Sequence, residues 1–450
     1  MLTVRAINRL NKFGQARHFC GSGPMNRLVA NIVSCAVIGL LSVPAIAQDN
    51  DKQWIGTWAT APQPPIPGGL LSLRNQTLRL IVHTSAGGTK IRIKISNTFG
   101  NRPLLIGDAH IARRAAAADI EPTSDRILMF HGHRSTTVPA QSMVVSDPVE
   151  LDTPALSDLA ISLFLPEAIE ATTSHVLAKQ TSYVSTNGGD FTAEVKFPES
   201  KKIKSWPFLT GVDVAASRGV AIVAFGSSLT DGDGTDSDSN ARWPDVLAER
   251  LQASAGRKAE VGVLNEGIIG NRLLNDSPVS AAGGQFGAAL GQAGLTRFER
   301  DVLGQAGVKY VVVGLGINDI AFPGSLTPAS ESINAENIIA GYRQLIARAH
   351  QRGIRIIGTT NPPFENSFLD LKPPVTFYTS EKERVRQKVN AWILSSGEFD
   401  GVIDLDAVLR DPNHPTQLLP GYDSGDHLHP NNAGCHAEGT AIPLALFEGH

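Results

Sequence analysis

A serine, a histidine and an aspartate in the C-terminal half of this sequence have the types and spacing needed for nucleophilic catalysis. Ser228 follows an apolar run at 219–225, within the segment GSSLTDG. Asp426 and His429 stand three residues apart near the C-terminus, within the segment DHLHP. A carboxylate at that spacing can orient an imidazole, and the imidazole can then take a proton from a serine hydroxyl.

Two further segments offer hydrogen-bond donors for a developing oxyanion. Gly270 follows an apolar run at 261–264, and a glycine lets its backbone N–H approach a substrate oxygen closely. Asn318 follows a run at 309–313, and its side-chain amide can donate. Each segment by itself is also typical of an ordinary turn or polar loop. Because all of them follow expected strands or form the last loop, we interpret them together as one catalytic group.

His427 and His429 also raise the alternative of a metal site in the last loop. The sequence offers no further ligands at a convincing spacing from this pair. We therefore expect neither a metal ion nor another cofactor.

Strands and helices are expected to alternate about five times from about residue 218 onward. Apolar strands are predicted at 219–225, 261–264, 309–313, 354–357 and 402–405. Helices are predicted at 243–251, 295–303, 335–350, 380–394 and from about 432. This alternation indicates an α/β domain with a parallel sheet and helices on both faces. Ligands of such sheets bind beyond the carboxyl ends of the strands, where the candidate residues stand.

The preceding part of the chain, from about 52 to 212, has the pattern of β-structure. Isoleucine alternates with polar residues at 89–96, which is the period of a half-buried strand. Further strands are expected at 77–82 and 159–165, with Gly, Pro, Asn and Asp between the runs. We predict an antiparallel β-sandwich or jelly-roll domain at 48–212 and the catalytic domain at 213–450. A chain of 450 residues is long enough for two domains.

The N-terminus has the features of an export signal. Arg27 precedes an apolar run at 29–43, and Ala45-Ile46-Ala47 follows it as a small-residue cleavage site. We predict a signal peptide at 1–47, cleavage after Ala47, and a secreted or periplasmic location. An uncleaved anchor is the alternative, and Met25 is an alternative start. Of Cys20, Cys35 and Cys435, only Cys435 would remain after cleavage, which excludes an intrachain disulfide.

The composition is that of an ordinary globular protein. Hydrophobic residues make up 42% and charged residues 18%, and the formal net charge is −3. A nucleic-acid binder normally carries a basic excess, so this class is disfavoured. No segment after the export signal is apolar and long enough to span a bilayer, so no stable membrane insertion is expected after cleavage.

Four blocks of the sequence resemble the SGNH, or GDSL, hydrolase superfamily, which carries Gly-Asp-Ser, a glycine, Gly-x-Asn-Asp and Asp-x-x-His-Pro in this order. The corresponding residues here are GSS at 226–228, Gly270, GIND at 316–319 and DHLHP at 426–430. The resemblance implies a three-layer, flavodoxin-like fold. It also implies Ser228 as nucleophile, His429 as general base and acid, and Asp426 as its partner. The implied oxyanion hole is the N–H of Ser228, the N–H of Gly270 and the Asn318 side chain.

One position departs from the family pattern. Ser227 stands where the family has the aspartate before the nucleophile. That aspartate is not one of the implied catalytic residues, so activity is expected to persist. We expect Ser227→Ala to retain most of the activity.

Several segments of the first half, WIGTWA at 54–59, SNTFG at 96–100 and SDPV at 146–149, are similar to secreted GDSL-type esterases with a leading β-domain. The expected function is a serine carboxylic ester hydrolase acting on a small-molecule or glycan ester, such as a short-chain acyl ester of a carbohydrate. The substrate expectation rests on export together with an accessory β-domain, which is an association at the level of the fold. The alternatives are a broad arylesterase or lipase, acyl transfer to an acceptor other than water, and a carbohydrate-binding protein without activity.

Overall fold

A computed structural model of the chain describes residues 53–186, 188–254, 260–278, 281–369 and 376–448. The expected signal peptide, with its cleavage site after Ala47 and the alternative start Met25, lies outside these residues. Asp51–His450 group into one compact unit. Among the described residues, no helix combines the length and apolar character required to cross a bilayer. In the same part of the chain, no cluster of His, Cys, Asp and Glu side chains is placed to hold a metal ion.

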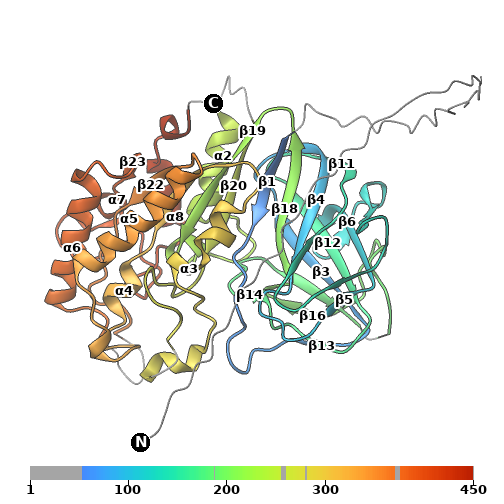
Figure 1. Cartoon of the computed structure of the whole chain (residues 1–450), viewed down its shortest axis with the longest axis horizontal. Coiled ribbons are helices and arrows are strands. Elements are labelled where there is room, and N and C mark those ends of the chain that lie inside the picture. Colours follow the sequence, from blue (N-terminus) through green and yellow to red (C-terminus); the bar gives the residue numbers. More distant parts are fainter. Residues whose placement is uncertain (1–52, 187, 255–259, 279–280, 370–375, 449–450) are drawn as a thin grey trace, which may run out of the picture. The chain divides into compact units, whose positions relative to one another are not determined.

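Two antiparallel sheets make up the first half of the described chain (Figure 1). The first has the strand order β1 (Gln53–Ala59), β18 (Leu209–Ala216), β4 (Gly88–Ser96) and β10 (Met143–Val145), with β11 (Val149–Thr153) also paired to β4. The second has the order β16 (Glu199–Ile203), β15 (Ser182–Ser185), β3 (Gln76–His83), β12 (Asp158–Leu165), β6 (Asp108–Ala116) and β7 (Asp119–Ile120), with β8 (Arg126–Ile127) paired to β6. Three short ribbons join β13 (Ile169–Glu170) to β2 (Ser72–Leu73), β14 (Ser174–His175) to β17 (Trp206–Pro207), and β5 (Leu104–Ile106) to β9 (Thr136–Val138).

One apolar core is shared by these two sheets. Ile91, Ile93 and Ile95 of β4 are fully buried, which confirms the alternating strand expected at 89–96. They belong to the same cluster as Leu78 and Leu80 of β3 in the other sheet. The alternation of apolar and polar residues therefore gives β4 one face for the core.

The second half contains a parallel sheet with the strand order β20, β19, β21, β22, β23. The bounds of these strands are Glu260–Gly267 for β20, Gly219–Gly226 for β19, Val308–Gly314 for β21, Arg355–Thr359 for β22 and Gly401–Ile403 for β23. Every neighbouring pair is parallel. Numbered along the chain, this is the order 2-1-3-4-5. The first strand lies inside the sheet, with the second strand on one side of it and the third, fourth and fifth strands on the other, so the strand order reverses at the first strand. All five strands expected from the apolar runs are present.

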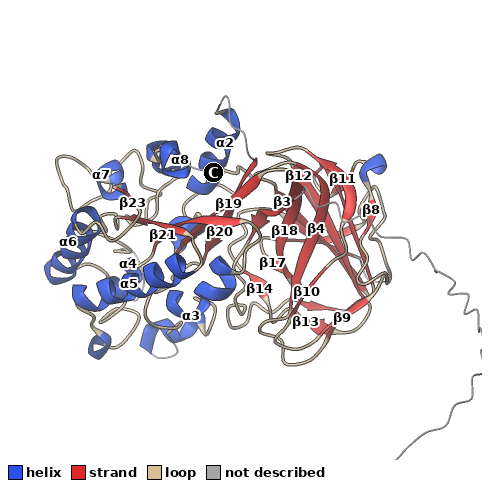
Figure 2. Ribbon diagram, turned by 45° about the horizontal axis from the view of Figure 1, so that its top comes forward, coloured by secondary structure: helices blue, strands red, loops and turns tan. Residues whose placement is uncertain are grey.

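Helices alternate with these strands along the chain, and Figure 2 shows them beside the parallel sheet. The longer ones are α2 (Trp243–Ala253), α5 (Ala335–Gln351), α6 (Ser380–Ser395) and α8 (Asn432–Ala441). The shorter ones are α1 (Ser228–Asp231), α3 (Gly294–Phe298), α4 (Ile317–Ala321) and α7 (Leu405–Leu409). The helix expected at 295–303 differs from the structure, because α3 ends at Phe298 and Glu299–Leu303 is π-helical.

Alternate residues of β19 face different helices. Val223 and Phe225 share a cluster with Tyr342 of α5. Ile222 belongs instead to a cluster with Leu247 of α2. A strand buried on both faces explains why 219–225 is apolar without alternation.

Glycines allow the antiparallel half to pack closely on the parallel sheet. A Cβ added to Gly56 of β1 would lie 2.6 Å from Cδ1 of Leu264 in β20. A Cβ added to Gly262 would lie 1.9 Å from the carbonyl oxygen of Gly56. The change from one kind of sheet to the other falls between β18, which ends at Ala216, and β19. The expected domain boundary at 212/213 stays a prediction.

Candidate active site

Ser228, His429 and Asp426 form one hydrogen-bonded chain. Ser228 is the first residue of α1, directly beyond the carboxyl end of β19. Its Oγ lies 2.8 Å from Nε2 of His429. Nδ1 of His429 lies 2.6 Å from Oδ2 of Asp426. The fold thus brings together a serine and an Asp–His pair that are about 200 residues apart in the sequence.

The carboxylate of Asp426 also fixes the turn that carries the histidine. Its Oδ1 accepts hydrogen bonds from the backbone N–H of Leu428 at 2.9 Å and of His429 at 2.8 Å. A carboxylate only accepts, so the imidazole proton is on Nδ1 and Nε2 is left to accept the Ser228 hydroxyl. Burial raises the pKa of Asp426, but the hydrogen bonds and charge of His429 outweigh it and lower the pKa to about 2. Asp426 is therefore ionised at neutral pH.

The turn containing Gly270 lies beside the start of α1. The backbone N–H of Ile268 donates to the carbonyl of Gly226 at 3.2 Å, and Asn271 N–H closes the turn onto Ile268 at 3.1 Å. Gly270 has a φ of +68°. This left-handed conformation favours glycine, which explains the residue type at this position.

Asn318 lies against the same turn. Its Nδ2 donates to the carbonyl of Asn271 at 3.0 Å. An amide nitrogen carries two hydrogens, so the second N–H is not used by this bond. The structure therefore places the two expected oxyanion donors, Gly270 and Asn318, on neighbouring segments.

Asp319 connects the segment of Asn318 to the segment of Gly270. Its carboxylate accepts from the backbone N–H of Leu273 at 2.7 Å and of Leu274 at 2.9 Å. Burial raises its pKa to about 6, although both backbone hydrogen bonds lower it. Asp319 thus links α4, which carries Asn318, to the chain that follows Gly270.

Arg297 is a buried cation behind the site that the sequence patterns did not single out. Its Nη2 donates to the carbonyl of Gly226 at 2.9 Å and its Nε to Oδ1 of Asn271 at 3.0 Å. Its charge is paired with Asp301 at 3.0 Å. Arg297 therefore holds the end of β19 and the Gly270 turn together. No local motif marks this role, because Gly226 and Asn271 come from distant segments.

Asp233 is a second carboxylate near the histidine that the sequence patterns did not single out. Its Oδ2 lies 3.9 Å from Nε2 of His429, and its Oδ1 lies 3.9 Å from Nζ of Lys179. Asp233 is partly exposed, whereas Ser228 is 3% and His429 4% exposed. The only signal in the sequence was its place between Gly232 and Gly234, five residues after Ser228.

Ser227 does not share the position of Ser228. It is fully buried, and its Oγ has no hydrogen-bond partner among the described residues. Its carbonyl accepts from the N–H of Thr230 and of Asp231, so it caps α1 through the backbone. The hydroxyl that reaches His429 is that of Ser228.

Residues 222–441 match the model of a family described as GDSL-like Lipase/Acylhydrolase. This part of the chain belongs to that family. The match includes Ser228, Gly270, Asn318, Asp426 and His429. The GDSL-like domain makes the protein an enzyme that hydrolyses carboxylic esters.

Several solved structures are similar to about half of the chain. One is a carbohydrate acetylesterase family member from Sinorhizobium meliloti, with 18% identity, 50% of this chain and 97% of that chain covered, and a TM-score of 0.38. Another is a putative arylesterase from Agrobacterium tumefaciens str. C58, with 21% identity, 51% and 99% covered, and a TM-score of 0.36. A third is the native M. smegmatis aryl esterase, with 18% identity, 50% and 96% covered, and a TM-score of 0.37. No curated protein sequence matches the chain.

Proposed function

We propose that this chain is a secreted serine carboxylic ester hydrolase that works through an acyl-serine intermediate on short-chain acyl esters, such as acetylated carbohydrates. The observation that carries the catalytic part is the chain of hydrogen bonds from Ser228 through His429 to Asp426. An ionised aspartate, a correctly oriented imidazole and a serine hydroxyl are the parts that acyl transfer requires.

In the proposed reaction, Nε2 of His429 takes the Ser228 proton while Oγ attacks the carbonyl carbon of the ester. The N–H groups of Ser228 and Gly270 and the free N–H of Asn318 stabilise the oxyanion. His429 then gives its proton to the leaving alcohol oxygen, and the acyl group stays on Ser228. A water molecule, activated by His429 in the same way, releases the acid. Asp426 stabilises the imidazolium in both steps.

Limited access to the nucleophile supports a small acyl group. Ser228 exposes 3% and His429 4% of their surface. The ring of Phe368 packs edge-on against the imidazole of His429, with the ring centres 5.9 Å apart. Space beside the reacting atoms is therefore restricted.

The position of Asp233 supports a leaving group that carries hydroxyls. The leaving oxygen must receive its proton from Nε2 of His429, and Oδ2 of Asp233 lies 3.9 Å from that atom. A carboxylate accepts hydrogen bonds from the hydroxyls of a sugar. A simple aryl alcohol offers no second hydroxyl to this group, so the arylesterase alternative is less favoured.

Three finer features belong to the same proposal. We propose export with cleavage after Ala47, supported by the apolar run at 29–43 and the small residues that follow it. We also propose a β-sandwich or jelly roll at 48–212, supported by the core that two sheets share. For 213–450 we propose a three-layer, flavodoxin-like arrangement, supported by the strand order and by α2 and α5 facing alternate residues of β19.

The test compares Ser228→Ala with the matched variant Ser227→Ala in hydrolysis of p-nitrophenyl acetate. Ser228→Ala is expected to reduce kcat by at least about a thousandfold. Ser227→Ala removes a buried hydroxyl that has no hydrogen-bond partner among the residues that the structure describes, so both kcat and Tm should stay close to wild type. The opposite order of effects would make the assignment of the nucleophile wrong, and equal background rates for wild type and Ser228→Ala would overturn the proposal.

The substrate part needs its own measurement. A series of p-nitrophenyl esters from acetyl to decanoyl, together with a panel of acetylated glycans, would rank kcat/KM by acyl length and leaving group. We expect acetyl esters to be hydrolysed fastest, and Asp233→Asn to weaken hydrolysis of acetylated glycans more than that of p-nitrophenyl acetate. A preference for decanoyl esters would favour the lipase alternative.

A further inference from the structure

Residue His175 of the antiparallel half is buried against the nucleophile helix. It lies in β14, is 1% exposed, and its ring faces Trp206 at 5.8 Å. Its Nε2 lies 2.8 Å from Oδ1 of Asp231, the last residue of α1. Its Nδ1 lies 2.9 Å from the carbonyl oxygen of Ala61.

Both ring nitrogens of His175 face oxygen atoms that accept hydrogen bonds. The carbonyl of Ala61 only accepts, and so does an ionised carboxylate. The contact between Nε2 of His175 and Oδ1 of Asp231 holds the Asp231 side chain in one orientation.

The other oxygen of Asp231 reaches the turn that carries Gly270. Oδ2 accepts a hydrogen bond from the backbone N–H of Ile269 at 3.0 Å. Ile269 directly precedes Gly270, and Asp231 is three residues after Ser228. One carboxylate thus ties the helix of the candidate nucleophile to the segment of the candidate oxyanion donor.

Strand β20, which leads into this turn, packs directly on α1, so the two segments have little room to move relative to each other. A Cβ added to Gly267 would lie 2.4 Å from the backbone nitrogen of Asp231. Nδ2 of Asn265 donates to the carbonyl of Thr230 at 2.7 Å. A change in the Asp231 carboxylate is therefore expected to act on the orientation of the Gly270 N–H rather than on the whole strand.

We infer that His175 is a positioning residue for ester hydrolysis: through Asp231 it fixes the orientation of the Gly270 N–H relative to Ser228. This inference rests on the proposed function, because it gives the proposed oxyanion hole a support from the antiparallel half. His175 itself touches none of the reacting atoms. Its loss should weaken stabilisation of the transition state and leave binding of the ground state nearly unchanged.

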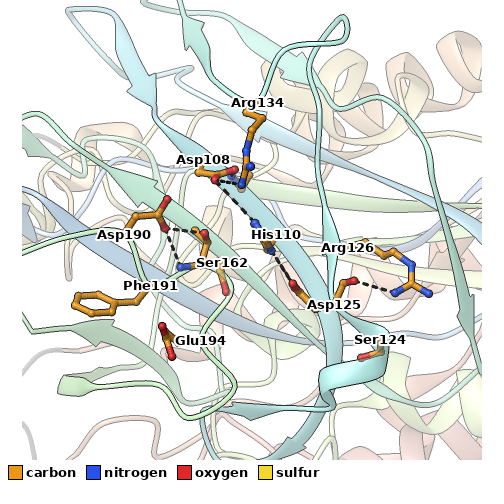
Figure 3. A network of polar contacts seen from close by, with 12 residues as sticks. Asp108, His110, Ser124, Asp125, Arg126, Arg134, Ser162, Asp190, Phe191 and Glu194 are labelled. Atoms are coloured by element: carbon orange, nitrogen blue, oxygen red, sulfur yellow. Dashed lines mark hydrogen bonds and ion pairs between the residues drawn. The ribbon is translucent and has the colours of Figure 1, made fainter.

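The chain provides a matched control in His110 of β6, which Figure 3 shows between Asp108 and Asp125. His110 is 3% exposed, and its Nδ1 lies 2.9 Å from Oδ2 of Asp125. It is therefore another buried histidine paired with an aspartate, but both carboxylates near it belong to the antiparallel half. Arg134 pairs with Asp108 at 2.6 Å in the same network.

The experiment measures kcat and KM for p-nitrophenyl acetate in wild type, His175→Ala, His110→Ala and Ser228→Ala, at a temperature where circular dichroism shows each to be folded. For His175→Ala we expect a kcat about tenfold to a hundredfold lower with KM within about twofold, somewhat less than the loss of a whole oxyanion donor. His110→Ala should keep kcat within about twofold. His175→Gln, which retains an N–H donor for one of the two partners, should recover part of the rate. If His175→Ala does not fold, kcat of His175→Gln is compared with wild type instead.

A double-mutant cycle with Asn318→Ala separates positioning from general destabilisation. If His175 acts on the oxyanion hole, the combined loss in kcat should be smaller than the product of the single losses. Additive losses, an unchanged kcat in His175→Ala, or an equal loss in His110→Ala would overturn the inference while Ser228→Ala remains inactive. A Ser228→Ala variant as active as wild type would instead overturn the proposed function.

Discussion

Replacing Asp426 by asparagine changes the hydrogen-bonding capacity of the catalytic loop without changing its shape. In the native loop Oδ1 accepts from the backbone N–H of Leu428 and His429, and Oδ2 faces Nδ1 of His429. In Asp426→Asn the amide oxygen keeps the two backbone donors, so the new NH2 group faces Nδ1. The imidazole must then carry its proton on Nε2 and can no longer accept the proton of Ser228.

The structure sets the size of this effect in two parts. The pKa of Asp426 lies near 2 instead of 3.8, which corresponds to about 2 kcal/mol and, after allowance for its partial exposure, to about 1 kcal/mol. Loss of that electrostatic support alone lowers the rate about tenfold or less. The wrong tautomer adds the larger part, which in the Ser-His-Asp template brings the total to about ten-thousandfold. We expect kcat to fall by about a hundredfold to ten-thousandfold.

A matched pair in the same loop serves as the control. Oδ2 of Asp423 lies 2.5 Å from Nδ1 of His427, and its Oδ1 accepts from the backbone N–H of His427 at 3.0 Å. This pair repeats the geometry of Asp426 and His429, but His427 is 45% exposed in its side chain and is not bonded to Ser228. Asp423→Asn should therefore keep kcat within about threefold. The measurement is kcat for p-nitrophenyl acetate in both variants, and the reasoning fails if Asp426→Asn stays within about tenfold of wild type or if Asp423→Asn loses as much.

Three other predictions follow from single residues. Burial raises the pKa of Glu438 from 4.5 to about 8. Ionisation of this buried group therefore lowers the free energy of unfolding of the protein as pH rises from about 4.5 through 8. Glu438→Gln should thus raise Tm clearly at pH 9 and only slightly at pH 5, and an equal shift at both values would contradict the raised pKa. A Cβ on Gly234, which has a φ of +90°, would lie 3.1 Å from Cβ of His429; Gly234→Ala should lower both Tm and kcat, and an unchanged kcat would show that His429 tolerates the contact. Asn318→Ala should lower kcat by about a hundredfold to a thousandfold with little change in KM, and a loss in KM alone would assign the amide to substrate binding.

Much of the fold was predictable because its signals are local. Isoleucine alternation marked β4, and unbroken apolar runs marked all five strands of the parallel sheet. Ser228, Gly270, Asn318 and the Asp426–His429 pair could be proposed from the sequence because each stands in a segment that follows an expected strand or in the last loop. In a parallel sheet the carboxyl ends of the strands lie at one edge, so sequence position alone brings such residues near one another.

Residues that act through distant partners could not be found in this way. Asp233 becomes notable only when His429 is placed 3.9 Å from it. Arg297 falls within an expected helix, and its role comes from the carbonyl of Gly226, 71 residues away. The structure also divides that helix into α3 and a π-helical segment, a change that no periodicity of apolar residues predicts.

The sequence by itself determined which residues are available for acyl transfer. It also determined the order along the chain of the strands that precede them. It also determined that the residue before the candidate nucleophile is Ser227, and tertiary structure decided that its hydroxyl is buried away from His429. Only the fold decided that His175 of the antiparallel half meets Asp231. The physical reason is that strand patterns depend on neighbours along the chain, whereas the contact between His175 and Asp231 depends on how β14 and α1 pack in the folded protein.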